Sequence, residues 1–399
     1  MHGLTAFGGP QAHIAMAMKT FVRQTPYVSE EELLEYNAFC QLLPGASSVQ
    51  TITLIGYKRG GVPLAILTLL VWILPACTIM LAFSFLVNFF DKGSTVTGIF
   101  KYIVPMAAGF LIYASFAAWP YSVKNLITGI IAVITAFFTF YFFGKPFVIP
   151  ILIIVGGIIT NLSKKRIPQI HDKPKKIQWW NIWLFAIIFI VAGILSETAR
   201  KNDWVSRKPI SLFENTYRMG SLVFGGGNVL MPMMYEQFSV RPEVVKEKNP
   251  NVVQVDREDM LLGMGLVRAV PGPVFSIASY TGGLALDDMG VSMHIAGGII
   301  GMVAIFLPSA LLVLFFFPIW YNLKKFSVIY RSLEGINAAV MGIMMGSTVY
   351  IIKDISFLSG GMLGVTNILV LCFSAGVLLF TKIPAPVIVV GCVLLGAIF

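Results

Sequence analysis

The chain has 399 residues, of which 57% are hydrophobic and only 12% are charged, whereas soluble domains carry about 25% charged residues. So few charges cannot cover the surface of a soluble globule, and the high apolar content also argues against disordered and fibrous proteins. The net charge of +10 is explained by cytoplasmic loops, where membrane proteins collect Lys and Arg. We therefore expect a lipid bilayer as partner and no nucleic acid.

Long apolar segments recur along the chain and predict membrane-spanning helices. Each is dominated by aliphatic residues, Phe and Gly, and the segments do not alternate with period two as the strands of a membrane barrel would. The predicted fold is an all-α polytopic membrane protein with about 11 to 13 membrane elements of roughly 20 residues or less. The predicted spans are 62–90, 102–121, 124–143, 145–161, 180–198, 291–318, 332–352, 364–381 and 383–399.

Four further elements, at about 3–22, 36–57, 212–238 and 259–283, contain Gly and Pro near their middle. The pieces on either side of each break are too short to cross a bilayer alone. Lipid cannot satisfy the backbone groups that a break sets free, so breaks persist where they face protein or a water-filled cavity. We expect these elements to be discontinuous or re-entrant helices.

Three sequence landmarks occur twice, in the same order and at about the same spacing, which indicates an internal repeat. The predicted crossings between the two copies are odd in number, so the second copy is predicted to be inverted relative to the first. The landmarks are Phe7-Gly8-Gly9 with Phe224-Gly225-Gly226, Pro44-Gly45 with Pro271-Gly272, and Leu74-Pro75 with Leu307-Pro308. The predicted domains are 1–162 as first repeat, 163–178 as basic cytoplasmic linker, 179–210 as extra span with its loop, and 211–399 as second repeat.

The breaks are candidate anion-binding sites. A half-helix that starts after a break presents unpaired N–H groups and the positive end of its dipole, which suits an anion. Capping of the next helix by Ser47 or Ser48, and close helix packing at Gly225–Gly227, are the alternatives. The recurrence of Pro-Gly favours binding. The candidate residues are Gly8, Gly9, Pro44, Gly45, Ser47, Ser48, Gly225, Gly226, Gly227, Asn228, Pro271 and Gly272.

Arg268 lies three residues before Pro271 in a predicted membrane element. A charged residue at this depth costs about 2.5 to 3.5 kcal/mol on insertion scales and is a functional candidate by default. Its guanidinium presents a fork of donors that suits a tetrahedral oxyanion, although a structural pairing with Glu258, Asp259 or a carbonyl is the alternative. Gln41, at the matching place in the first repeat, either donates an amide N–H to the anion or bonds a neighbouring helix.

Two other polar residues have two interpretations each. His13 follows the first break and titrates near neutrality, so it is a candidate for a coupling proton, with a structural role as the alternative. Arg218 either lines an entry route or extends to the membrane interface, and the second reading is favoured. The sequence has no zinc-protease, P-loop or Rossmann motif, so we predict no enzyme activity, no cofactor and no metal.

The motifs resemble those of the chromate ion transporter family, and the likeness covers nearly the whole chain in the long, two-domain form. The resemblance implies a multi-pass carrier of the inner (cell) membrane that expels chromate, with sulfate as the similar competitor. Ala46 and Arg268 depart from the usual family pattern, which leaves the identity of the oxyanion open. The motifs are 7–14, Phe21-Val22, 43–50, 56–61, Leu74-Pro75, 224–227, 270–273 and Leu307-Pro308.

The sequence therefore predicts a secondary transporter that moves chromate or a similar tetrahedral oxyanion by alternating access, in the direction of efflux. Rocking of one half of the chain against the other would expose the site to each side in turn. Uptake of sulfate or another anion is one alternative, and a membrane sensor or scaffold without flux is another. A homodimer is compatible with the sequence.

Overall fold

The computed structural model describes residues 9–89, 100–143, 145, 148–162, 179–224, 227–245, 252–323, 327–354, 362–381 and 383–398. Within these ranges all regular secondary structure is helical, which confirms the predicted all-α fold. The predicted linker 163–178 and the first break at Phe7-Gly8 lie outside the described residues. The first part of the chain forms α1 (Gly9–Ala17), η2 (Met18–Gln24), α2 (Glu30–Cys40), α3 (Ser47–Phe89), α5 (Ile103–Ser122), α6 (Leu126–Tyr141) and α7 (Val148–Asn161).

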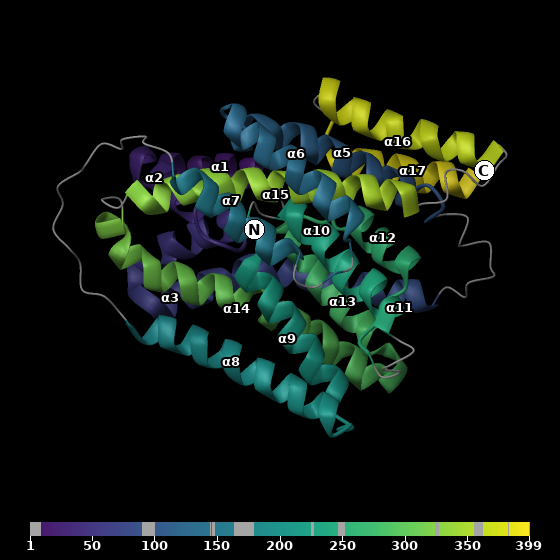
Figure 1. The fold of residues 1–399 in the computed structure, drawn as a ribbon, viewed down its shortest axis with the longest axis horizontal. Coiled ribbons are helices and arrows are strands. Elements are labelled where there is room, and N and C mark those ends of the chain that lie inside the picture. The colour runs from purple at the N-terminus through teal and green to yellow at the C-terminus, as the bar shows by residue number, and fades with distance from the viewer. Residues whose placement is uncertain are drawn as a thin grey trace.

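The helix α8 (Trp179–Lys201) precedes the second part of the chain and lies along one edge of the molecule, opposite α16 and α17 (Figure 1). The helices of the second part are α9 (Arg207–Leu222), α10 (Gly227–Tyr235), η3 (Glu236–Val240), α11 (Arg241–Val245), α12 (Arg257–Leu266), η4 (Val274–Ser276), α13 (Ile277–Ala285), η5 (Asp287–Met289), α14 (Val291–Leu323), α15 (Ser327–Asp354), α16 (Met362–Phe380) and α17 (Ala385–Ile398).

Four stretches of described helix are long and apolar enough to cross a membrane. They are Ser47–Val87, Trp179–Lys201, Val291–Pro318 and Glu334–Lys353. The other predicted spans correspond to the apolar helices α5, α6, α7, α16 and α17, which are 14 to 20 residues long. Side chains of α8 such as Ile187, Ile190 and Ile194 are more than half exposed, so this helix presents an apolar surface suited to lipid.

The long helix α3 is divided by a kink at Gly60 and Gly61. Gly61 has φ of 64° and ψ of −156°, a conformation that glycine adopts without a Cβ penalty. The kink separates the segment 47–59 from the segment 62–89, and the predicted span at 62–90 begins at this point. The predicted break in the element 36–57 is the non-helical stretch 41–46 between α2 and α3.

Two helical hairpins follow from these breaks. The first hairpin consists of α2 and residues 47–59 of α3, and its open end is joined by an ion pair of 2.6 Å between Lys58 Nζ and Glu32 Oε1. The second hairpin consists of α12 and α13, and at its open end the Tyr280 hydroxyl donates a hydrogen bond of 2.6 Å to the Asp259 carbonyl. We call residues 41–46 the first tip and residues 267–273 the second tip.

Small residues bring the surrounding helices into close contact, as is usual in membrane helix packing. A Cβ on Gly335 of α15 would lie 1.9 Å from the Gly156 carbonyl oxygen of α7, and one on Gly342 would lie 2.2 Å from the Ala132 carbonyl oxygen of α6. The largest apolar core combines residues of both halves of the chain, including Ala46, Ala76 and Phe275. The two tips therefore lie in one shared core, whereas Leu33, Tyr36 and Phe39 of α2 pack in a separate core cluster with residues of α14 such as Phe317.

Candidate functional site

The first tip rests on the middle of α14. The Ala46 amide donates a hydrogen bond of 3.2 Å to Ser309 Oγ. Gly45 has φ of +111°, and a Cβ at this position would lie only 1.8 Å from the same Ser309 oxygen. Glycine is thus required twice, by the positive φ and by the close approach.

The second tip makes the matching contact with α3. Gly272 has φ of +125°, and a Cβ there would lie 2.7 Å from the Cβ of Ala76. Ala76 follows Pro75 and Ser309 follows Pro308, so the Gly of each repeated Pro-Gly motif contacts the residue that follows the Leu-Pro motif of the other half. Both contacts lie near the midpoint of a long helix, the segment 62–89 of α3 or α14.

The break between α9 and α10 lies between the two tips. On one side the Gly45 amide donates a hydrogen bond of 2.7 Å to the Val223 carbonyl. On the other side a Cβ on Gly227 would lie 2.7 Å from the Cβ of Val274, just past the second tip. The predicted donors Gly225 and Gly226 lie outside the described residues, and Asn228 is described only as part of α10.

The helix α1 contacts the first turn of α3, next to the first tip, through His13. Its Nδ1 lies 3.1 Å from Ser48 Oγ, and the two residues are 1% and 4% exposed. The His13 ring also packs edge-on against Trp72, with ring centroids 5.4 Å apart. The structure thus brings the predicted residues His13 and Ser48 together, while Gly8 lies outside the described residues and Gly9 begins α1.

Gln41 and Gln50 occupy different environments at the first tip. The predicted Gln41 is an exposed residue at the end of α2, whereas Gln50 is 1% exposed. The Gln50 amide nitrogen donates to the Pro44 carbonyl at 2.9 Å and to the Ser309 carbonyl at 3.3 Å. Gln50 was missed by the sequence analysis, although an amide inside an apolar helix was the signal that could have found it.

Arg268 lies at the second tip, on the wall of a cavity of about 240 Å³. Tyr113 of α5, Gly272, and Thr381 beyond α16 line the same cavity. The Arg268 Nη2 lies 3.8 Å from the Met231 sulfur of α10. A guanidinium beside a hydroxyl-bearing cavity can bind an anion.

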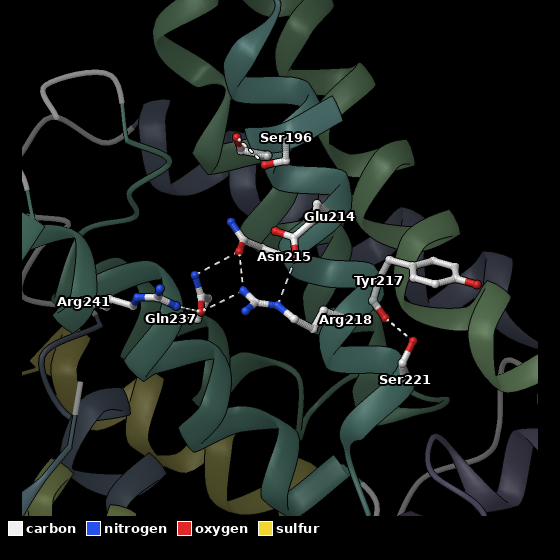
Figure 2. A network of polar contacts seen from close by, with 9 residues as sticks. Ser196, Glu214, Asn215, Tyr217, Arg218, Ser221, Gln237 and Arg241 are labelled. Carbon is white, nitrogen blue, oxygen red and sulfur yellow. Dashed lines mark hydrogen bonds and ion pairs between the residues drawn. The ribbon is translucent and has the colours of Figure 1, made fainter. Parts of the chain in front are cut away.

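A polar network surrounds Arg218 in a second cavity, of about 420 Å³, between α7, α9, η3 and α15. Figure 2 shows Arg218 between Glu214, Asn215 and Gln237, with Arg241 on the far side of Gln237. Arg218 Nε lies 3.1 Å from Glu214 Oε1, and its Nη2 donates a hydrogen bond of 2.7 Å to Asn215 Oδ1. Phe224, beside the α9–α10 break, also lines this cavity, so the cavity extends from Arg218 to that break.

The fold is that of a polytopic helical membrane protein whose interrupted helices meet at mid-length of its long helices. Residues 1–161 and 210–397 match the chromate transporter family. The chain therefore belongs to the chromate transporter family, and the match in two parts agrees with the long form of that family.

Curated relatives match across most of the chain. An uncharacterized transporter of Methanocaldococcus jannaschii is 25% identical over 87% of this chain and 81% of its own length. A chromate transport protein of Cupriavidus metallidurans is 22% identical over 99% of this chain and 90% of its own length. An uncharacterized transporter of Bacillus subtilis is 26% identical over 43% of this chain but 89% of its own length. No solved structure matches the chain significantly.

Proposed function

We propose that this protein is a secondary membrane transporter of chromate or a similar tetrahedral oxyanion. The observation that carries the proposal is the reciprocal contact of the two tips, Gly45 on Ser309 and Gly272 on Ala76. Broken helices that meet near the midplane are a recurrent arrangement of transporter binding sites. The name of the relative from Cupriavidus metallidurans, a chromate transport protein, supports an oxyanion as substrate.

The two hairpins enter the membrane from opposite sides in this proposal, so the domains 1–162 and 211–399 are inverted repeats. In Figure 1, α2 lies toward one end of the molecule and α11 and α12 toward the other. The tips of both hairpins contact the middle of long helices. The relative from Bacillus subtilis, which matches only 43% of this chain, supports a single half as an independent unit.

The oxyanion binds between the breaks, where Arg268 compensates its charge and the amides of the tips donate hydrogen bonds. Ser47 and Ser48 add hydroxyl donors, and Gln41 an amide. His13, whose Nδ1 lies 3.1 Å from Ser48 Oγ, stays a candidate for a coupling proton, with a structural role as the alternative. The proposed binding residues are Gly8, Gly9, Gln41, Pro44, Gly45, Ser47, Ser48, Gly225, Gly226, Gly227, Asn228, Arg268, Pro271 and Gly272.

Alternating access is proposed to arise from rocking of one half against the other at the reciprocal tip contacts. Each tip belongs to one half and rests on a helix of the other, so a relative rotation would open one side of the site and close the other. We expect net efflux from the cell across the inner membrane.

Counterflow in proteoliposomes tests the proposed function. Vesicles loaded with unlabelled chromate should accumulate external radiolabelled chromate faster than vesicles without protein, because a carrier exchanges substrate across the membrane. The same measurement with sulfate in place of chromate distinguishes a sulfate carrier from a chromate carrier. Absence of counterflow with both anions would contradict transport and favour a sensor or scaffold.

A further inference from the structure

Glu236, the first residue of η3, lines the cavity of about 420 Å³ that contains Arg218. The residue is only 7% exposed, and its Oε1 has no hydrogen-bond partner among the described residues. A buried carboxylate without a partner is costly in its ionised form. Ionisable groups inside membrane proteins often mark ion pathways or proton relays.

Charged groups surround Glu236 on several sides. Arg218 of α9 lies across the cavity and is ion-paired with Glu214, Arg241 follows on α11, and Lys145 lies before α7. Among the described side chains of α15, Ser332 and the apolar Ile336 line the cavity. Glu236 therefore has an unpartnered carboxylate oxygen among the described residues, in a cavity whose other charged wall residues, Arg218 and Lys145, are cations.

The same cavity can hold an anion. Arg218 and Gln237 line its wall and both donate N–H groups to Asn215 Oδ1, so an anion here would share these donors with Asn215, and a guanidinium suits a tetrahedral oxyanion. An ionised Glu236 would repel the anion and would also reduce the attraction of the anion to the Arg218 guanidinium. A protonated Glu236 removes that repulsion and supplies an O–H donor.

We propose that Glu236 takes up one proton when an oxyanion occupies this cavity, so that anion binding and proton binding are linked. The proton comes from the aqueous phase and returns to it when the anion leaves, and no other bond forms or breaks. The inference rests on the proposed function, and it adds Glu236, which the sequence analysis did not consider, as a residue that binds the coupling proton. The cavity reaches Phe224 at the α9–α10 break, and residues on both sides of that break contact the tip regions, Val223 at Gly45 and Gly227 at Val274.

Equilibrium binding of radiolabelled chromate to the purified full-length protein tests the linkage. For the unmodified chain we expect affinity to rise as pH falls, by up to about tenfold per pH unit for one linked proton. Glu236→Gln mimics the protonated side chain, so its affinity should equal that of the unmodified chain at low pH and lose this extra pH dependence. Protonation of chromate itself affects both proteins equally, so the difference between their slopes isolates Glu236.

Two further variants complete the test. Glu236→Asp keeps a titratable group and should keep the pH dependence of chromate affinity. It shows that a substitution at this position does not by itself remove the pH dependence through a folding defect. Glu243→Gln removes a carboxylate of α11 that pairs with Arg257 away from the cavity, and should behave like the unmodified chain. A Glu236→Gln slope equal to that of the unmodified chain overturns the inference alone, whereas absence of both binding and counterflow in the unmodified chain overturns the proposed function as well.

Discussion

Gly45 of the first tip and Ser309 of α14 approach so closely that a Cβ on Gly45 would lie 1.8 Å from the Ser309 hydroxyl. The two residues belong to different halves of the chain: Gly45 is part of the repeated Pro-Gly motif, and Ser309 directly follows the repeated Leu-Pro motif. Their contact, with that of Gly272 and Ala76, joins each interrupted helix to a long helix of the other half. In the proposed function the binding region is therefore assembled between the two halves.

Gly45→Ala should destabilise the protein and abolish transport. The left-handed conformation costs a non-glycine residue about 1 to 2 kcal/mol, and the clash with Ser309 adds about 1 to 3 kcal/mol of overpacking. Thermal unfolding in detergent measures the loss. Gly193→Ala in α8 is the matched control, because a Cβ there meets no atom within 4 Å; equal unfolding temperatures for the two variants would contradict the tip contact.

Gly272→Ala should be rescued in part by Ala76→Gly. The new Cβ at position 272 would lie 2.7 Å from the Ala76 Cβ, and removal of that methyl group relieves the contact. The strain of φ at +125° persists, so rescue is incomplete. A double-mutant cycle on unfolding temperature and counterflow should give a coupling of about 0.5 to 3 kcal/mol; additive effects would mean that the second tip does not pack against α3.

Arg268→Gln should weaken chromate binding strongly while the protein still folds. A hydrogen bond to a charged group contributes about 1.5 to 3 kcal/mol, which corresponds to about 10- to 150-fold in the dissociation constant. Arg268→Lys keeps the charge but loses the fork of donors, so its chromate affinity should lie between that of the unmodified chain and that of Arg268→Gln. Radiolabelled chromate binding at matched protein levels measures the effect, with Arg257→Gln as control, and an unchanged affinity would remove Arg268 from the site.

His13→Gln should lower stability but keep most of the pH dependence of chromate binding. The His13 Nδ1 is engaged by Ser48 and its ring packs on Trp72, so a structural role accounts for its burial. His13→Gln and Ser48→Ala should be less than additive in unfolding experiments, because both remove the same hydrogen bond. If His13→Gln abolishes the pH dependence and Glu236→Gln does not, the coupling proton belongs to His13 instead.

The helical fold was predictable because its signal is local. Apolar segments of spanning length define membrane helices without reference to the rest of the chain, and α5, α8 and α15 lie close to their predicted ranges. The break at 41–46 was also predictable, since Pro44 and Gly45 prevent a continuous helix. The choice of Gln41 as amide donor depended only on its place before the break, and it stays a prediction.

The sequence alone determined that the chain is an all-α membrane protein with repeated Pro-Gly breaks, because hydropathy and backbone restrictions act over a few residues. Only the tertiary structure decided which residues meet: Gly45 with Ser309, His13 with Ser48, and Gln50 with Pro44. It likewise placed Arg268 and Glu236 on the walls of separate cavities. Such encounters depend on how closely small residues let distant helices approach, and this packing is a property of the whole fold.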